Sequence, residues 1–326
     1  MAAVVTYSPA VTLVPTYECF NACSYCNFRV PPGQGSWLSL AEANQRLARI
    51  RGHSPQVTEV LLLSGEVHPR HPRRAAWVAH LAQLAELAWA WGFWPHTNAG
   101  PLTAAEMAHL GAVNASMGLM LEQLRPDLAV HRHAPSKDPR LRLAQLEQAG
   151  RLGIPFTTGL LVGIGESPQD WETTLQAIAA VHRRWGHIQE VIVQPYRRGT
   201  AQHGHLPDFP LEQLPAVVRL ARQILPAEIT VQIPPNLVNH PQVLLACLAA
   251  GARDLGGIGP QDEVNPDYPY PQVEALATLL ARHGYTLRPR LPIYPPWLSQ
   301  RWPQGVPYPK PQITDEVFCG ANPRLG

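Results

Sequence analysis

The sequence lacks a surplus of charge of either sign. Its 26 lysines and arginines, of which only Lys137 and Lys310 are lysines, oppose 24 aspartates and glutamates, and the formal net charge is +2. This balance gives no electrostatic reason to expect a nucleic acid or a membrane as partner. Apolar residues make up 45% of the chain, which is enough for a sizeable core and excludes wholesale disorder.

Long apolar runs and an early basic segment are lacking too. The first lysine or arginine is Arg29, so we expect no secretory signal peptide. No run reaches the roughly 18 apolar residues that span a membrane. Of only five cysteines, three lie within eight positions, while Cys247 and Cys319 are far away. This set is not a secreted disulfide framework, and we expect a reducing, cytoplasmic location.

Short apolar runs alternate with helical patterns along the 326 residues. The runs are mostly continuous, which is typical of parallel strands buried on both faces. They recur about every 35 residues, the size of one βα unit. Eight such units predict an α/β fold, a (β/α)8 barrel of TIM type, with a flat doubly wound sheet as the alternative. The predicted strands are residues 11–17, 60–63, 93–97, 116–121, 156–162, 190–194, 229–233 and a weak one near Leu255.

The predicted helices lie between these strands. Ser167 before Pro168 is typical of a helix start, and Gly92, Gly153 and Gly186 follow helical stretches, where a left-handed residue ends a helix. The predicted helices are residues 40–51, 73–91, 103–110, 141–152, 168–184, 211–225, 240–250 and 273–283. We expect residues 1–285 to form the barrel domain and residues 286–326 a proline-rich, irregular C-terminal extension packed on it.

The strongest chemical signal is a group of cysteines directly after the first predicted strand. Cys19, Cys23 and Cys26 form a CxxxCxxC loop at the carboxyl edge of the barrel, where active sites lie. Three thiolates can each bind one iron of a [4Fe–4S] cube and leave the fourth iron open. An open iron can bind a substrate, whereas a fully ligated cluster only carries electrons. We therefore expect these three cysteines to be metal ligands.

Two other interpretations of the cysteine loop are weaker. Structural zinc needs four ligands, yet no histidine precedes His53, and the distant Cys247 and Cys319 would have to join the loop. A ferredoxin-type cluster would need a fourth cysteine at a familiar spacing. Cys247 lies in an apolar helical stretch, where a cysteine is expected to be part of the core.

The cysteine loop, with Tyr25 before its third cysteine, resembles the signature of radical S-adenosylmethionine (SAM) enzymes. Residues 64–66 (SGE) match the Gly-Glu element of that family, and residues 159–166 (GLLVGIGE) match its GxIxGxxE element. The resemblance implies that SAM binds the open iron of a [4Fe–4S] cluster and is cleaved to a 5′-deoxyadenosyl radical. The SAM-binding residues that it implies are Tyr25, Ser64, Gly65, Glu66, Glu122, Leu161, Gly163 and Glu166.

Further stretches resemble one branch of that superfamily, the CofG family of deazaflavin-forming enzymes. They include residues 95–100 (PHTNAG), 116–122 (SMGLMLE), 187–194 (HIQEVIVQ) and 234–237 (PPNL). The resemblance implies conversion of 5-amino-5-(4-hydroxybenzyl)-6-(D-ribitylimino)-5,6-dihydrouracil to 7,8-didemethyl-8-hydroxy-5-deazariboflavin (FO), with release of ammonia, in coenzyme F-420 synthesis. It also implies that a partner subunit, CofH, supplies the substrate and that a ferredoxin- or flavodoxin-type protein donates the electron.

Polar side chains at predicted strand ends are the candidates for binding the substrate. Amide groups suit a uracil edge because they offer donors and acceptors together. The candidates are His96, Thr97, Asn98, Gln194, Arg197 and Asn236. A basic loop after the fourth strand either pairs with the SAM carboxylate or is solvated; it contains His131, Arg132, His133 and Lys137. The alternatives are another radical SAM enzyme, of the biotin-synthase-like or menaquinone-pathway group, and a non-catalytic iron–sulfur electron carrier.

Overall fold

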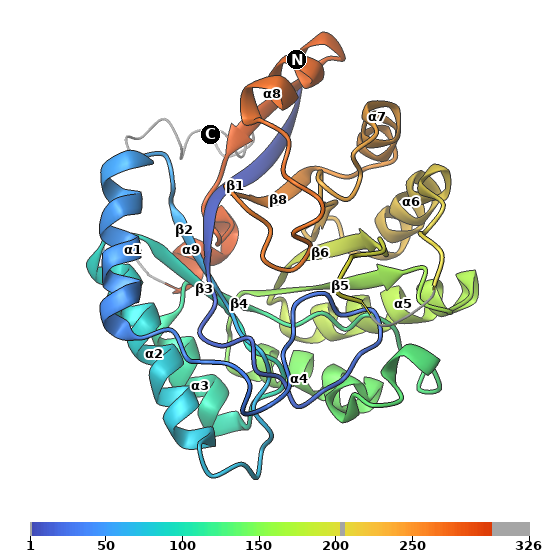
Figure 1. Cartoon of the computed structure of the whole chain (residues 1–326). Helices are drawn as coiled ribbons and strands as arrows, with labels where there is room; N and C mark the ends of the chain where they lie inside the picture. The colour runs from blue at the N-terminus through green and yellow to red at the C-terminus, as the bar shows by residue number, and fades with distance from the viewer. Residues whose placement is uncertain (1, 203–205, 302–326) are drawn as a thin grey trace.

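Parallel strands form one sheet, most of which closes into a barrel. The structure is a computed structural model that describes residues 2–202 and 206–301. The nine strands in these residues are β1 (Ala3–Leu13), β2 (Glu59–Leu63), β3 (Trp94–Asn98), β4 (Ser116–Gly118), β5 (Phe156–Val162), β6 (Ile188–Pro195), β7 (Thr230–Gln232), β8 (Asp254–Ile258) and β9 (Tyr285–Pro289). Neighbours follow chain order from β2 to β8, and β1 pairs with both β8 and β2, which closes the ring (Figure 1). The predicted (β/α)8 barrel is confirmed, and the flat sheet is excluded.

Helices connect the strands and cover the outside of the barrel (Figure 1). They are α1 (Leu40–His53), α2 (Arg74–Ala90), α3 (Ala104–Val113), α4 (Pro139–Arg151), α5 (Pro168–Trp185), α6 (Leu214–Ile224), α7 (Pro241–Ala249), α8 (Val273–Arg282) and α9 (Pro295–Arg301), with short 3-10 turns η1 (Ala129–His131), η2 (Pro135–Lys137) and η3 (Leu211–Gln213). As predicted, Ser167 caps α5, and Gly186 ends it in a left-handed conformation.

The first strand differs most from its prediction. Residues 11–17 were the expected strand, but β1 begins at Ala3 and ends at Leu13. Residues 3–7 pair with β9, and residues 10–13 pair with β2. The first residues of this early half are apolar, but this run is short and is followed by polar, half-buried side chains, among them Thr6 and Tyr7. Its strand structure depends on partners that come late in the chain.

The C-terminal part of the described chain closes the amino-terminal end of the barrel. The extension from residue 286 was expected to be irregular; that is wrong for residues 286–289, which belong to β9, and for residues 295–301, which form α9. The Pro292 carbonyl accepts hydrogen bonds from Ser116 Oγ at 2.6 Å and Gln189 Nε2 at 2.9 Å, near the starts of β4 and β6. Residues 290–301 are called the closing segment below. The boundary at residue 285 stays a prediction, and residues 302–326, with Trp302 and Cys319, lie outside the described residues.

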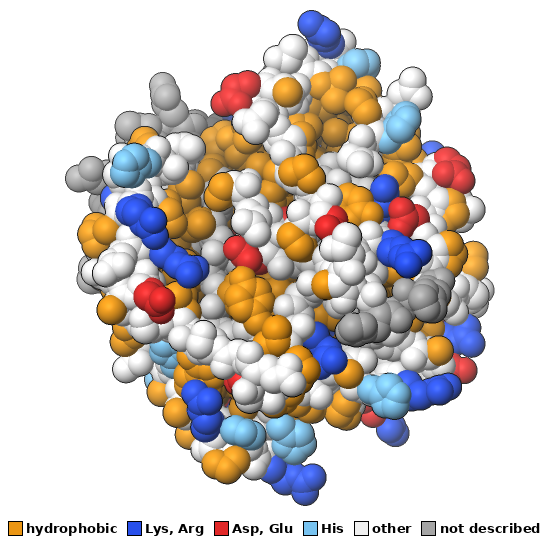
Figure 2. Space-filling view, viewed as in Figure 1, with side chains coloured by type: hydrophobic (Ala, Val, Ile, Leu, Met, Phe, Trp, Pro, Cys, Tyr) orange, Lys and Arg blue, Asp and Glu red, His pale blue; other side chains and the backbone are white. Residues whose placement is uncertain are grey.

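The surface fits the balanced charge of the sequence. On the face seen in Figure 2, Lys and Arg side chains are scattered among acidic and apolar ones and form no continuous basic patch. Among the described helices, none has the length and apolarity needed to cross a membrane.

Replacing Trp297 tests how much the closing segment contributes to stability. Trp297 is 5% exposed, packs with Trp94 and Leu291, and donates a hydrogen bond to the Gly186 carbonyl at 2.8 Å. We expect Trp297→Ala to lower the free energy of unfolding by about 3–5 kcal/mol, because it leaves a large cavity. Urea denaturation measures this change.

The matched control is Leu141→Ala, since Leu141 is 39% exposed on α4. Its expected effect is within about 0.5 kcal/mol. Equal unfolding midpoints for the two variants would show that the closing segment does not stabilise the barrel.

Candidate active site

A deep cavity occupies the inside of the barrel. Its volume is about 360 Å³, within the usual range for small-molecule sites. The lining runs from Cys19 and Cys26 at the carboxyl end of the strands to Arg290 and Pro292 of the closing segment. Barrel interiors are normally filled by layers of branched side chains. Here Gly118, among other glycines, lines the wall and leaves space.

The cysteine loop forms one wall of this cavity. Cys19, Cys23 and Cys26 are free thiols, and all three line the cavity. Backbone hydrogen bonds fix the loop to two other segments: Phe20 N donates to the Glu66 carbonyl at 3.0 Å, and Ala22 N to the His133 carbonyl at 2.7 Å. The loop therefore has a defined position relative to the ends of β2 and β4.

The three thiols fit an iron–sulfur cube better than a single ion. In the described part of the chain, no three His, Cys, Asp or Glu side chains converge as the ligands of one ion do. A [4Fe–4S] cube binds each thiolate at a different iron, so its ligands need only face one shared space. Burial raises the pKa of Cys23 to about 12, and the nearby Lys137 opposes this rise. Binding to a cationic group such as iron would favour the thiolate form of this cysteine.

Glu66 lies beside the cysteine loop at the end of β2. Its carboxylate accepts hydrogen bonds from Asn21 Nδ2 at 2.8 Å, from Arg142 Nη2 at 3.1 Å and from Ser136 Oγ. Close packing surrounds it: a Cβ on Gly100, which has φ +78°, would lie 2.4 Å from the Glu66 side chain. The carboxylate is therefore held rigidly at the cavity wall.

Glu122 forms a second buried acidic site after β4. It has φ +66°, a conformation that a non-glycine residue adopts only under strain. It accepts hydrogen bonds from Tyr25 Oη at 2.5 Å, from His131 Nε2 at 3.0 Å and from Lys137 Nζ. Burial alone would raise the pKa of Glu122, but Lys137, His131 and Arg142 hold it well below its usual value. Two residues of the predicted basic loop thus bind Glu122, and that loop is not simply solvated.

The glycine-rich turn after β5 is organised by its own glutamate. Glu166 accepts hydrogen bonds from Gly163 N at 2.6 Å, Ile164 N at 2.8 Å and Trp171 Nε1 at 2.7 Å. Leu161 lines the cavity, whereas Gly163 and Glu166 are not among its lining residues. The turn therefore shapes the edge of the site, and only Leu161 of this element faces the cavity.

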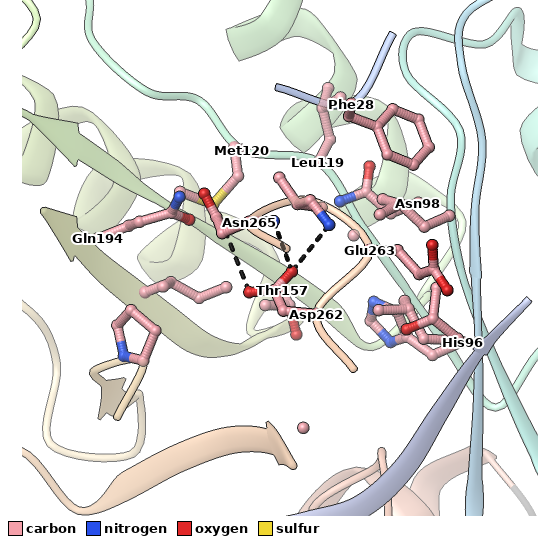
Figure 3. Close-up of a pocket in the computed structure, with 18 of the residues that line it drawn as sticks. Phe28, His96, Asn98, Leu119, Met120, Thr157, Gln194, Asp262, Glu263 and Asn265 are labelled. Atoms are coloured by element: carbon pink, nitrogen blue, oxygen red, sulfur yellow. Dashed lines mark hydrogen bonds between the residues drawn. The ribbon is translucent and has the colours of Figure 1, made fainter. Parts of the chain in front are cut away.

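The candidate substrate residues divide by the direction of their side chains. His96, Asn98 and Gln194 line the cavity, and Figure 3 shows His96 and Asn98 from β3 opposite Gln194 from β6. Thr97 lies between the first two on β3 and points away, since strand side chains alternate. Three candidates lie outside the cavity lining or are held by other side chains. Thr97 bonds to Asn114 at 2.7 Å, Asn236 to Asp262 at 2.8 Å and Arg197 to Asp208 at 3.1 Å.

Charged side chains at the floor of the cavity were missed. Glu59, Glu190 and Arg290 line its lower part. Arg290 donates to Glu190 at 2.7 Å and to Asp254 at 2.6 Å. Burial and the nearby Asp254 raise the pKa of Glu190, although Arg290 opposes them. An acidic residue directly before the apolar residues 191–193 of a strand was the available signal for Glu190. No signal in the sequence marked Arg290 as a cavity residue, because its segment was expected to be irregular.

The chain is similar to known proteins over most of its length. The radical SAM superfamily model matches residues 13–178. A 7,8-didemethyl-8-hydroxy-5-deazariboflavin synthase of Thermosynechococcus vestitus is 63% identical over 298 residues, which are 90% of this chain and 94% of that protein. The synthase of the same name from Trichormus variabilis is 59% identical, over 91% of this chain and 88% of that protein.

Solved structures with lower identity share the fold. The FeFe-hydrogenase maturase HydG from Carboxydothermus hydrogenoformans has a TM-score of 0.68 at 19% identity, covering 88% of this chain and 68% of that one. Methylornithine synthase (PylB) has a TM-score of 0.64 at 16% identity, covering 87% and 83%. The identities in sequence confirm the resemblance seen in the motifs. The chain belongs to the radical SAM superfamily and, within it, to the family of 7,8-didemethyl-8-hydroxy-5-deazariboflavin synthases.

Proposed function

We propose that this chain closes the deazaflavin ring: it converts 5-amino-5-(4-hydroxybenzyl)-6-(D-ribitylimino)-5,6-dihydrouracil to FO and releases ammonia. The observation that carries the proposal is one cavity lined both by the three cysteines and by polar groups suited to a uracil. The names of relatives that are 63% and 59% identical give the product, and the substrate is the one that the family resemblance implies. Because a carbon–nitrogen bond breaks as ammonia leaves, the reaction is that of a carbon–nitrogen lyase.

The cofactors follow from the family, and the residues that hold them are part of this proposal. Cys19, Cys23 and Cys26 hold a [4Fe–4S] cluster, and SAM binds its open iron. When bound, these groups supply a carbon radical that removes a hydrogen atom from the substrate. The chain itself supplies position and electrostatics. Burial inside the barrel keeps water away from the reacting carbon.

Glu66 is the proposed partner of the SAM ammonium. A carboxylate has about four acceptor positions, and three donors already occupy Glu66. One acceptor position therefore remains for a further donor from the cavity. The other proposed SAM contacts are Tyr25, Ser64, Gly65, Glu122 and Leu161 at the cavity wall, with Gly163 and Glu166 shaping the turn beside the adenine.

The substrate enters from the open end of the barrel, because the closing segment blocks the other end. His96, Asn98 and Gln194 are the proposed substrate contacts, since they face the cavity. In this proposal CofH supplies the substrate, and a ferredoxin- or flavodoxin-type protein delivers the electron to the cysteine end. Thr97, Arg197 and Asn236 act indirectly, by holding the strands and loops around the site.

A direct test of the function is a single anaerobic reaction. It contains the reconstituted chain, a reductant, SAM, tyrosine, the ribityl-diaminouracil and an active CofH. We expect a fluorescent deazaflavin, detected by chromatography, that is absent when this chain is omitted. Release of 5′-deoxyadenosine without deazaflavin would keep the radical chemistry and refute the substrate. Absence of both products, with the cluster intact, would favour an electron carrier.

Removing single cysteines tests the ligand set. We expect Cys19→Ala, Cys23→Ala and Cys26→Ala each to lose most of the bound iron and all SAM cleavage, because one iron of the cube then lacks its ligand. Iron and sulfide content, together with 5′-deoxyadenosine release, measure the effect. Cys247→Ala is the matched control: Cys247 is fully buried in α7, so the variant keeps the iron content of the parent. Full activity in any loop variant refutes the assignment.

Changing Glu66 tests the ammonium site. Glu66→Gln removes the negative charge but keeps the shape, and we expect SAM to bind about 10- to 100-fold more weakly, as for a lost charged hydrogen bond. Cluster content stays unchanged. Equilibrium dialysis with SAM measures the dissociation constant. Glu106→Gln changes another partly buried partner of an arginine, Arg74 at 2.8 Å, away from the cavity. A similar weakening in both variants would contradict a specific role of Glu66.

A further inference from the structure

The cavity has two tiers of polar groups, set by strand register. Gln194 on β6 pairs in register with Leu161, while Glu190, four residues earlier, pairs with Thr157. Gln194 therefore lies near the cysteine end and Glu190 near the closing segment. The lower tier is defined as the polar cavity residues below the level of Gln194, and its highest member, Gln232, pairs with Ile192. It consists of His96, Thr157, Glu190, Gln232 and Arg290.

His96 presents a bare nitrogen to this lower tier. The Ser116 hydroxyl donates its proton to the Pro292 carbonyl at 2.6 Å, and it also lies 2.7 Å from His96 Nδ1. Because the hydroxyl has one proton, Nδ1 must be the donor to Ser116 Oγ, and Nε2 carries the lone pair. Burial and the cation of Arg290 lower the pKa of His96 to about 3, so the ring is neutral at ordinary pH. The carboxylates of Glu59 and Glu190 line the same cavity.

Other groups of the lower tier also have hydrogen-bonding capacity left. Among the described residues, no hydrogen bond joins the side-chain amide of Gln232 or His96 Nε2 to another protein group, and both residues line the cavity. Glu190 Oε1 accepts from Arg290 and Tyr294, and Oε2 accepts from Thr157 at 3.1 Å. Oε2 can accept one more. Because the pKa of Glu190 is raised, its carboxyl can carry a proton. The tier thus offers an acceptor at His96 and combined donors and acceptors at Glu190 and Gln232.

We infer that this lower tier is a polyol subsite that binds the ribityl chain of the substrate. The inference rests on the proposed function. The reacting carbon must lie at the cysteine end, so the opposite end of the substrate reaches the floor. A polyol presents a run of hydroxyls, each a donor and an acceptor, which matches the mixed set at the floor. An aromatic end placed there would leave His96 Nε2, Gln232 and Glu190 without a partner, which disfavours that orientation.

The apolar part of the cavity fits the rest of the substrate. Leu119 and Met120 lie in the upper part of the cavity beside Phe28 in Figure 3. These side chains suit the benzyl group, which has to be near the site of hydrogen abstraction. Asn98 and Gln194, in the upper tier, remain for the uracil edge. Ser116 is a positioning residue in this arrangement, because it acts on the ligand only through His96.

The test is a thermodynamic cycle between ligand and protein. The ligands are FO and an analogue in which methyl replaces ribityl. Both are bound to the cluster-loaded chain with SAM and without reductant, and fluorescence gives the dissociation constants. The parent is expected to bind FO at least 10-fold more tightly than the analogue. Gln232→Met keeps the side-chain volume and removes the amide; it is expected to weaken FO about 10-fold and leave the analogue unchanged. Gln194→Met, in the upper tier, is expected to weaken both equally.

Ser116→Ala removes the oxygen that fixes the proton of His96 on Nδ1, so that the ring can carry its proton on either nitrogen. We expect this variant to show a smaller preference for FO over the analogue. Thermal melts of each variant identify a folding defect, which would lower both affinities together. The subsite is refuted if the parent binds the two ligands with equal affinity. It is also refuted if Gln232→Met, in a folded protein, weakens the binding of both ligands equally. FO formation by the same parent preparation is measured alongside. A parent that forms no FO refutes the proposed function, whereas one that forms FO without preferring it to the analogue refutes only the subsite.

Discussion

The buried guanidinium of Arg142 holds the cofactor end of the barrel together. Its side chain is 2% exposed and reaches Glu66 after β2 at 3.1 Å, Glu122 after β4 at 3.9 Å and the Ser136 carbonyl in η2 at 3.1 Å. A buried cation with carboxylates on two sides is stable only while these partners stay in place. One side chain of α4 thus fixes both acidic residues of the site. Through Tyr25, which donates to Glu122, it also fixes the cysteine loop.

The barrel could be predicted from the sequence because its signals are local. Apolar runs such as residues 156–162 coincide with an observed strand, and Ser167 caps a helix as expected. The cysteine loop and Glu66 could be found for the same reason, since each motif is contiguous and follows a strand. Thr97 and its neighbour His96 were both predicted to bind the substrate, although side chains alternate along a strand and only one of the two can face the cavity. A stricter use of that alternation would have predicted only one of them.

The floor of the cavity could not be predicted because its contacts join distant parts of the chain. Arg290 meets Glu190 across a separation of 100 residues, and no local pattern marks an arginine in a proline-rich stretch as a barrel residue. The early half of β1 was missed for a similar reason: its edge is completed by β9. In both cases the position of a polar residue depends on a partner that is distant in the sequence. A run of apolar residues, in contrast, predicts its own burial.

The position of β9 and the closing segment has a consequence for the order in which the molecule forms. β1 is synthesised before the other described strands, yet its partners β8 and β9 are among the last described segments. Thr6 and its hydrogen-bond partner Asp254 are 248 residues apart, and such distant pairing slows folding, since a long loop must be ordered first. Until then the nascent barrel is open at its lower end and lacks the arginine that neutralises Glu190 and Asp254. The interior therefore acquires its floor only after the cysteine loop at the opposite end has been made.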